Sequence, residues 1–455
     1  MAAAVCLLII ALLLYLLWVI VPWVRRYHAA QLDRSSAPAS GHRLLKPRTP
    51  DDCPACRRPA VRPPAAPAPP PTVRPWREHK SRRGAPRRIP TDGFACPNRA
   101  CLYYRITDAQ IHALVGDGTH GTHESIQSFR CQACKTTFTS RRDTPLYRLK
   151  TPSQRVGEVL TALAEGLSVA AAVRVFGHSH ATIATWLTRA GKHSAALHNH
   201  WFQNLALPHI QLDELRTRRR RRAHVLWLWV ALDPLTKIIP VLHLDARNQA
   251  AAHAVIHDLR QWLASGCLPV FTSDGLNLYF YALTAHFGQW VTGARQGKRE
   301  WQVAVGLIYG QCKKMYRRRQ VVRVTHVMRW GTALELKAAL QGVGLSGRLN
   351  TAFVERVNLT VRQGVAALAR RTWATAQEVP SLLAHLDWWR AYYHFVRPHA
   401  SLRVPLADPI ERGGRRRPRR YRQRTPAMAA GLTSRRWSVR DLLLVPLSPT
   451  AGGAG

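Results

Sequence analysis

The chain of 455 residues is 46% hydrophobic, which leaves room for two or three domains and excludes a chain that is disordered throughout. Its 67 Lys and Arg outnumber its 25 Asp and Glu, so the formal net charge is +42. This excess favours a polyanionic partner, with nucleic acid the first candidate and an anionic membrane surface the second, because cations set against phosphates release counterions. A GC-rich genome that favours arginine codons would produce the same excess.

The N-terminal segment, 1–26, carries no charge between residues 2 and 24 and ends in Arg25 and Arg26. At about 1.5 Å per helical residue it is long enough to cross a bilayer core of about 30 Å. Two interpretations remain open: a single-pass membrane anchor through residues 2–24, or a start codon placed upstream of the true one. In both cases we expect the body of the chain to be cytoplasmic and associated with the nucleoid.

Residues 27–91 form a Pro- and Arg-rich linker that contains Cys53 and Cys56. The next segment, 92–150, holds two further cysteine pairs in CPNRAC and FRCQACKTTF. Thiolates at such spacing favour a metal site over disulfides, and we expect a small zinc ribbon with one structural Zn²⁺. His120 or His123 could replace one thiolate, and Cys53 with Cys56 could be the true first pair. The expected ligands are Cys96, Cys101, Cys131 and Cys134.

Residues 151–206 carry the pattern of three helices separated by short turns that contain glycine. Ser153 begins the first, Ser168 is placed to cap the second, and Gly177 is placed to end it. This pattern predicts a helix-turn-helix whose last helix, beginning near residue 180, enters the major groove of DNA. A helical hairpin with no role in DNA binding would show the same pattern. The expected groove-facing residues are His180, Thr182, Thr185 and Arg189.

From residue 207 to 410 the pattern is that of an α/β domain. HIQLDEL predicts a strand that ends on Asp213, followed by strands over 224–233 and 237–245, a helix over 249–264, and a strand that ends on Asp274. This order is that of a ribonuclease-H-like fold, in which the first and fourth strands lie side by side. We therefore expect Asp213 and Asp274 to share a metal at the adjacent strand ends.

A third carboxylate is expected from Glu355 in the helix predicted over FVERVNLTVRQ, because the neighbouring valines give that helix an apolar face. Glu335 and Glu378 are its rivals. Three carboxylates suit two Mg²⁺ (or Mn²⁺) ions that cleave phosphodiester bonds. Beyond residue 410 the Arg-rich sequence of 411–455 predicts a basic disordered tail.

Several of these stretches resemble bacterial insertion-sequence transposases, most closely the insertion-sequence-one group and its relatives. The similar stretches lie between about 94 and 408: FRCQACKTTF, the helix-turn-helix region, LDELRTRRRRRAHVLWLWVALDPLTKII, FTSDGLNLY and NTAFVERVNLTVRQ. In addition, YYHFVRPHASL is similar to the closing motif of many integrase-like transposases. The apolar N-terminus, the linker, the wide spacing between cysteine pairs and the very basic residues 295–330 depart from the family pattern.

The resemblance implies a DDE transposase, an enzyme that cuts and joins double-stranded DNA at element ends and target, as a homo-oligomer on DNA. It matches Asp213, Asp274 and Glu355 to the family's acids and places Asn358 and Arg362, which we expect to face DNA, in the glutamate helix. Two other functions remain open. One is a catalytically silent zinc-ribbon and helix-turn-helix DNA-binding protein, with or without a membrane tether, and the other is a nuclease without strand transfer.

Overall fold

The computed structural model describes residues 73–79, 89–218, 225–292, 299–374, 378–410 and 418–447. The expected membrane segment, most of the linker with Cys53 and Cys56, and the last residues of the chain lie outside the described residues. Among the helices of the described ranges, none combines the length and the apolar character needed to cross a bilayer.

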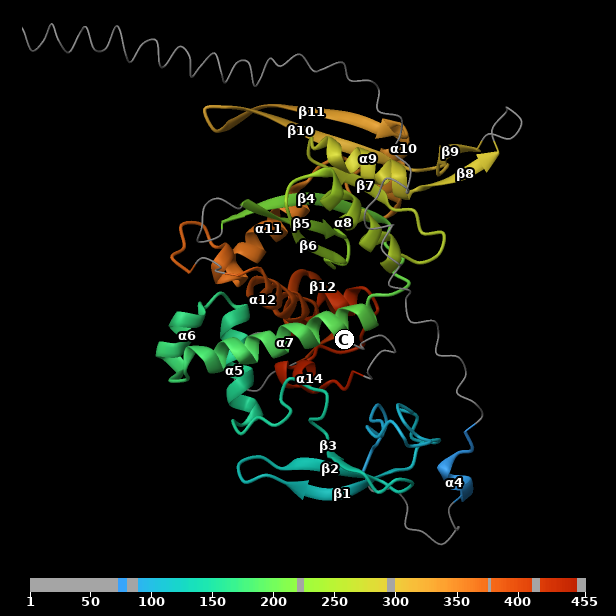
Figure 1. Cartoon of the computed structure of the whole chain (residues 1–455). Helices are drawn as coiled ribbons and strands as arrows, with labels where there is room; N and C mark the ends of the chain where they lie inside the picture. The colour runs from blue at the N-terminus through green and yellow to red at the C-terminus, as the bar shows by residue number, and fades with distance from the viewer. Residues whose placement is uncertain are drawn as a thin grey trace, which may run out of the picture. The chain divides into compact units, whose positions relative to one another are not determined.

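The cysteine-bearing segment folds around a three-stranded antiparallel sheet (Figure 1). Phe129 and Phe138 lie opposite each other on two of the strands, with ring centroids 5.7 Å apart. They pack with the cysteines into a small core of their own. The elements are α4 (Trp76–His79), β1 (Leu114–His120), β2 (Ile126–Cys131) and β3 (Thr137–Thr139).

Three helices follow: α5 (Ser153–Ala164), α6 (Val169–Phe176) and α7 (His180–Trp201). The expected caps of α6 are confirmed, since Ser168 accepts a hydrogen bond from the backbone N–H of Ala171 and Gly177 ends the helix with a φ of 72°. Helix α7 is long and packs against α12 (Val379–Ala391). Gly191 makes this approach possible, because a Cβ there would lie 2.3 Å from the carbonyl oxygen of Ala384.

The main sheet has six strands in the order β11-β10-β7-β4-β5-β6. Strands β4, β5 and β6 form an antiparallel meander, whereas β4, β7 and β10 run parallel to one another. A mixed α/β architecture is therefore present. The strands are β4 (His209–Arg218), β5 (Val225–Leu232), β6 (Val241–Asp245), β7 (Val270–Ser273), β10 (Tyr309–Arg317) and β11 (Gln320–Trp330).

Helices cover both faces of this sheet because its strands alternate between two apolar cores. Trp229 and Ala231 of β5 pack with α8 (Gln249–Trp262) and α9 (Asn277–His286), whereas Leu228, Val230 and Leu232 pack with α11 (Ala352–Gly364) and α12. The remaining elements of this region are α10 (Ala333–Gly342), η3 (Ala366–Leu368), η4 (Tyr392–Val396) and the two-stranded pairs β8 (Gly288–Thr292) with β9 (Arg299–Val303) and β12 (His399–Ile410) with β13 (Arg419–Arg424).

Two strands begin or end at residues other than those predicted from the sequence. Strand β4 does not end on Asp213 but runs to Arg218, because it remains paired with β5 along its whole second half. Strand β6 begins at Val241 rather than near residue 237. The residues before it form a turn in which Asp233 accepts hydrogen bonds from Leu235 and Thr236.

The prediction of a disordered tail over 411–455 is wrong for residues 418–447. Strand β13 pairs with β12, and α13 (Pro426–Ala429) and α14 (Val439–Leu444) follow it. Trp437, Leu442 and Leu443 are buried in the same apolar core as residues of α5 and α7.

The sequence also predicts a domain boundary between residues 206 and 207, but the described residues on both sides of it pack into one core. One core runs from α5 through β4 to α14, and the Trp388 indole of α12 donates to the Leu160 carbonyl of α5 at 2.8 Å.

Candidate active site

Two acids lie side by side on neighbouring parallel strands of the main sheet, one within β4 and one directly after β7. In the parallel pair β4–β7, Leu212 is in register with Ser273, so Asp213 and Asp274 follow at the same level. One carboxylate oxygen from each, together with one from Glu214, lies within 4.8 Å of the others. The expectation from the sequence that the first and fourth strands lie side by side is met.

Glu355 is held at this edge by a strand residue that the sequence analysis did not single out. Gln211, two residues before Asp213, accepts a hydrogen bond from the backbone N–H of Val354 at 3.0 Å and donates to the Asn350 carbonyl at 2.9 Å. This buried amide fixes the first turn of α11 against β4. The signal that could have revealed it was a glutamine between Ile210 and Leu212, two apolar residues of the strand that carries Asp213.

Glu355 lies at the rim of the acidic group and is not one of the three acids within 4.8 Å. Its side chain is 46% exposed and forms an ion pair with Lys314 of β10. It also accepts a hydrogen bond from the Thr351 hydroxyl at 2.6 Å. Partial burial alone would lower the pKa of Lys314, but the hydrogen bond to Glu355 and its negative charge outweigh burial and raise that pKa.

Asp213 is buried beside other acids, and no described residue forms an ion pair with it. Burial is the main reason that its pKa rises to about 7, and the neighbouring charges of Glu214, Asp274 and Glu355 add to the rise. The Asn358 amide donates to Asp213 at 2.7 Å, but an amide adds no positive charge. A divalent cation beside Asp213 and Asp274 would supply the charge that is missing.

Glu214 belongs to the acidic group but faces other partners. Consecutive strand residues point to opposite faces, so Glu214 turns toward the face covered by α8 and α9. Its side chain is 2% exposed, pairs with Arg247 and accepts a hydrogen bond from the Tyr279 hydroxyl at 3.3 Å. Burial and the charge of Asp274 raise its pKa. The sequence analysis missed this residue, because the acid next to Asp213 had no distinguishing pattern.

All four acids line one open hollow, and cations surround them. Glu335 instead caps α10 through Thr332, Glu378 precedes α12, and neither of these two described residues lines the hollow. The hollow thus distinguishes Glu355 from its rivals. The cations that line it are Arg216, Lys313, Lys314, Arg362 and Arg370.

The expected DNA-facing residues fall into two groups. His180 and Thr185 are exposed on α7, and Thr182 shares a 2.9 Å hydrogen bond with the capping Ser179 hydroxyl. Arg189, by contrast, donates to the Tyr147 carbonyl at 2.5 Å. On α11, Asn358 and Arg362 both line the acidic hollow, and Arg362 donates to the carbonyls of Leu368 and Arg216.

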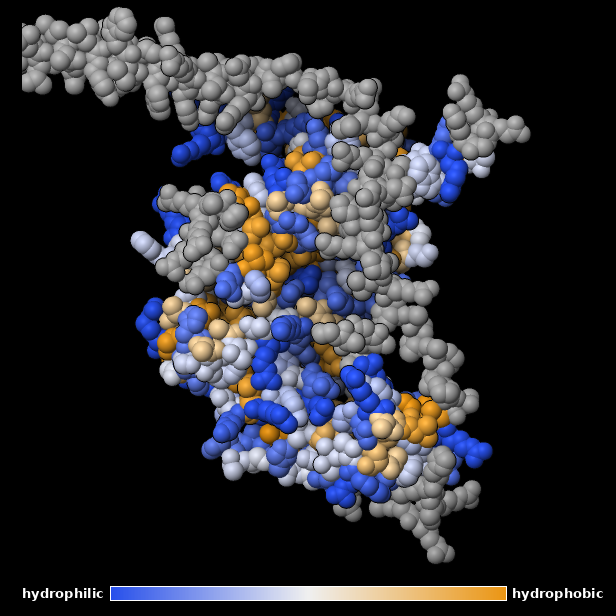
Figure 2. Space-filling view, viewed as in Figure 1, coloured by the Kyte–Doolittle hydropathy of each residue, from blue (hydrophilic) through white to orange (hydrophobic). Residues whose placement is uncertain are grey.

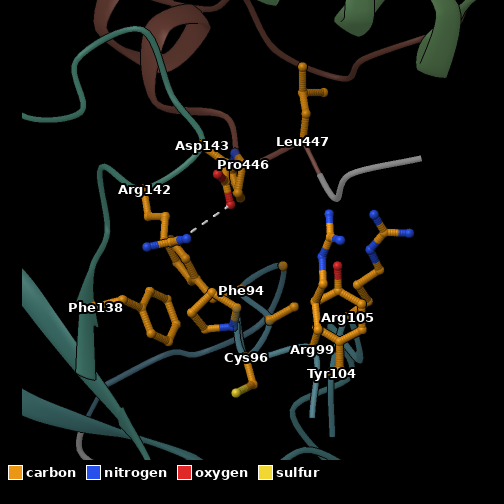
Figure 3. A pocket seen from close by; sticks show the side chains of 13 residues that line it. Phe94, Cys96, Arg99, Tyr104, Arg105, Phe138, Arg142, Asp143, Pro446 and Leu447 are labelled. Atoms are coloured by element: carbon orange, nitrogen blue, oxygen red, sulfur yellow. Dashed lines mark ion pairs between the residues drawn. The ribbon is translucent and has the colours of Figure 1, made fainter. Parts of the chain in front are cut away.

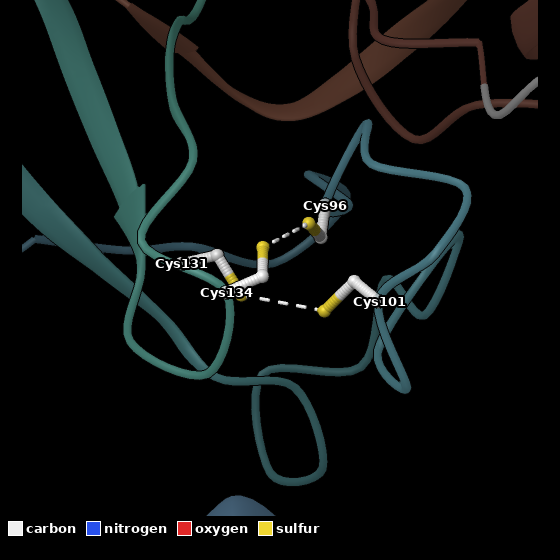
Figure 4. Close-up of side chains that lie close together, drawn as sticks. All are labelled: Cys96, Cys101, Cys131 and Cys134. Carbon is white, nitrogen blue, oxygen red and sulfur yellow. Dashed lines mark hydrogen bonds between the residues drawn. The ribbon is translucent and has the colours of Figure 1, made fainter.

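The four expected zinc ligands come together at the end of the small sheet (Figure 4). The sulfur atoms of Cys96 and Cys134 are 3.5 Å apart, and those of Cys101 and Cys131 are 3.8 Å apart. Tetrahedral ligation with Zn–S bonds of about 2.3 Å places sulfurs about 3.8 Å apart, so the donor set fits zinc. His120 and His123 are exposed and stand outside this group.

The thiols differ in their acidity. Burial raises the pKa values of Cys96 and Cys101. Burial also acts on Cys134 and would raise its pKa, but hydrogen bonds with Thr136 outweigh burial and lower the pKa of Cys134 to about 6. One ligand is therefore already a thiolate near neutral pH, which favours metal capture.

A second hollow lies beside Cys96, with Arg99, Arg105 and Tyr104 on one side and Arg142 on the other (Figure 3). Its one acid, Asp143, lies 3.9 Å from Arg142. The chemistry of this hollow suits an anion and not a metal ion.

No protein-family model and no curated protein matches the chain.

Proposed function

We propose that the chain is a DDE transposase, which cuts and joins DNA strands at the ends of an insertion sequence. The observation that carries the proposal is the meeting of Asp213, within β4, and Asp274, directly after β7, on adjacent parallel strands, with Glu355 on the rim of the same hollow. The resemblance of these stretches to insertion-sequence transposases supports the same function.

A ribonuclease-H-like architecture is part of this proposal. Its support is the order β6-β5-β4-β7-β10, in which three antiparallel strands are followed across a helix by two strands parallel to the first. Metal-dependent phosphodiester chemistry on such a sheet needs acids that meet on its first and fourth strands, and Asp213 within β4 and Asp274 directly after β7 would supply them.

The residues at the hollow fit two Mg²⁺ or Mn²⁺ ions. Its acidic donors are carboxylate oxygens, and a cation would offset both the burial and the neighbouring carboxylates that raise the pKa of Asp213. When bound, such ions activate the attacking oxygen and stabilise the leaving oxygen of a phosphodiester.

The protein's own side chains would divide the remaining work. Asp213 and Asp274 would hold metal, and Gln211 would keep Glu355 within reach by anchoring α11 to β4. Asn358 orients the Asp213 carboxylate through its 2.7 Å hydrogen bond. Lys313, Lys314, Arg216 and Arg370 would attract the DNA phosphates, because they surround the acids with positive charge.

The N-terminal part would bind the element ends. A zinc ribbon is supported by the four-sulfur geometry, and a helix-turn-helix by the capped α6 and the exposed His180 and Thr185 at the start of α7. The arginines beside Cys96 would add contacts to phosphates.

The test uses purified full-length protein, Mg²⁺ and a labelled duplex that carries the DNA flanking the gene. Cleavage followed by joining to a second duplex is expected, and Asp274→Asn should abolish both. Asp245→Asn is the matched control, because Asp245 also ends a strand but is exposed outside the hollow. Cleavage without joining would identify a nuclease, and binding without cleavage a DNA-binding regulator.

A further inference from the structure

Strands β10 and β11 form a ribbon whose two halves differ in their surroundings. The inner half belongs to the main sheet, since Tyr309, Gly310 and Gln311 pair with β7. From Met315 to His326 every residue is exposed, including those on both faces of the paired strands. Figure 1 shows β10 and β11 as a long two-stranded ribbon. We call residues 315–326 the arm.

The charge of the ribbon has one sign. Residues 309–330 contain no Asp or Glu. Within the described part of the chain, the arginines of the arm form no ion pair. The Lys and Arg residues of the ribbon are Lys313, Lys314, Arg317, Arg318, Arg319, Arg323 and Arg329. In Figure 2 the end of the ribbon projects as hydrophilic side chains. Such a surface fits a polyanion.

The tip of the arm places arginines where the backbone favours other residues. Arg317 pairs with Gln320, so Arg318 and Arg319 alone make the turn, with φ angles of 48° and 67°. A two-residue turn with both φ angles positive is the type in which Asn-Gly is strongly preferred. The chain thus carries two cations at its most exposed turn in spite of an unfavourable backbone conformation.

The arm begins beside the acids. Gln311 is in register with Ser273, so Cys312 is level with Asp274, and β10 continues about 20 Å beyond Gln311 at about 3.4 Å per residue. Lys313, Lys314 and Tyr316 line the hollow that the acids line. A DNA strand with a phosphate at the acids would therefore lie next to the arm.

We propose that the arm docks onto the DNA duplex that flanks the phosphodiester bond held at the acidic hollow. The inference rests on the proposed function, because it takes DNA as the substrate. A two-stranded β-ribbon fits the major groove, which is about 12 Å wide, and arginines on such a ribbon can contact phosphates on both sides. Pairing of β11 with β11 of a second copy would instead bring two acid-free basic strands together, which repulsion opposes.

The test compares two full-length double variants that each lose two positive charges. Arg318→Asn with Arg319→Gly supplies the preferred turn residues, so the thermal midpoint should stay level or rise. Affinity for flanking duplex should fall roughly tenfold or more, and the slope of log affinity against log salt should become shallower by about 1.8. Lys337→Gln with Arg348→Gln removes exposed charges from α10 and the loop after it, and should change affinity less than twofold.

Affinity is measured in the Asp274→Asn background, so that the result does not depend on cleavage. A loss of DNA affinity that occurs only in the Arg318→Asn, Arg319→Gly variant supports docking of the arm, even if strand transfer is never observed. Equal losses of DNA affinity in both double variants would overturn the docking proposal but would not contradict the proposed function. Failure of the parent protein to bind duplex would overturn both. A changed mass in analytical ultracentrifugation with unchanged DNA affinity would assign the arm to self-association and overturn the docking proposal.

Discussion

Glu355 is the residue whose role is tested most directly by a conservative change. Glu355→Gln keeps the shape of the side chain and removes a charge from the rim of the acidic hollow. If this carboxylate holds metal, strand cleavage should fall by orders of magnitude. Folding should change by less than about 1 kcal/mol, because the partly exposed ion pair with Lys314 contributes little. Cleavage of a labelled duplex and the free energy of unfolding are the two measurements.

Glu335→Gln is the matched control for that change. Glu335 occupies the capping box of α10, where a glutamine can make the same hydrogen bonds, so cleavage should stay within a few-fold of the parent protein. Normal cleavage by Glu355→Gln, at equal DNA affinity, would remove Glu355 from the set of metal ligands.

The residues of the site differ in how far the sequence could predict them. The strand order predicts that Asp213 and Asp274 meet, although the sequence analysis expected β4 to end on Asp213. Gln211 and Lys314 could not be paired with Glu355 from the sequence, because 144 and 41 residues (355 minus 211 and 355 minus 314) separate them along the chain. Contacts of this kind depend on how β4, β10 and α11 pack, and no local pattern encodes that.

At the scale of elements, the four cysteines should determine whether the small sheet folds. We expect one zinc per full-length chain by metal analysis, with Cys131→Ser losing the metal and Cys267→Ser, a thiol outside the group, retaining it. Chelation should unfold the β1–β3 segment, because a core this small depends on the metal for stability.

The same experiment decides between the cysteine pairs. Cys53→Ser should leave the zinc content unchanged. Zinc that is lost from Cys53→Ser but kept by Cys96→Ser would instead make Cys53 and Cys56 the first pair.

Glu124 joins the cysteine-bearing segment to helix α5 and makes that junction sensitive to acid. The N-cap Pro152 makes no side-chain cap hydrogen bond, but Glu124 accepts hydrogen bonds from the backbone N–H and the hydroxyl of Ser153 and pairs with Arg141. Partial burial alone would raise the pKa of Glu124, yet these partners outweigh it and lower the pKa to about 2.

A carboxylate whose pKa is lowered on folding stabilises the folded state above its unfolded pKa, and this contribution disappears as the pH falls toward the folded pKa. We therefore expect Glu124→Gln to lower the free energy of unfolding by up to about 3 kcal/mol at pH 7. The difference from the parent protein should disappear between pH 4.5 and 2. Chemical denaturation across that range measures it. Glu158→Gln, which removes an exposed pair with Arg155, should change stability by less than about 0.5 kcal/mol at any pH.

Helix caps were the elements most readily predicted from the sequence, since Ser168 and Gly177 act within a few residues of themselves. Helix α14 was not predicted, because the basic residues around Trp437 and Leu442 make this stretch similar in composition to a disordered segment. Some partners of its apolar face lie on α5 and α7, more than two hundred residues earlier in the chain, and others lie on η4. Strand β4 was also predicted too short, because arginines near the end of a strand are typical of a loop.

At the scale of the whole molecule, Trp437 connects the C-terminal segment to the core. Its ring stacks on Phe395 with centroids 4.5 Å apart and meets the edge of Trp201 at 5.4 Å. Trp437→Ala should lower the free energy of unfolding by about 3–5 kcal/mol, because a fully packed aromatic leaves a cavity.

Trp373→Ala is the control, since the Trp373 side chain is fully exposed, and it should have almost no effect on the denaturation midpoint. Equal stability of the two variants would show that the C-terminal segment is not needed by the core. By the same reasoning, removal of residues 412–455 should destabilise the protein and not merely weaken its binding to DNA.

The position of Trp437 also bears on how the protein is made. A ribosome synthesises the chain from its N-terminus, so Trp201 and Phe395 leave it before Trp437, Leu442 and Leu443 exist. Until the last stretch emerges, the apolar surface that these residues later cover is open to water and to other nascent chains, and such surface promotes aggregation. A premature stop codon between residues 397 and 437 should thus yield a product that chaperones and proteases remove, even though every acid of the candidate site has been translated.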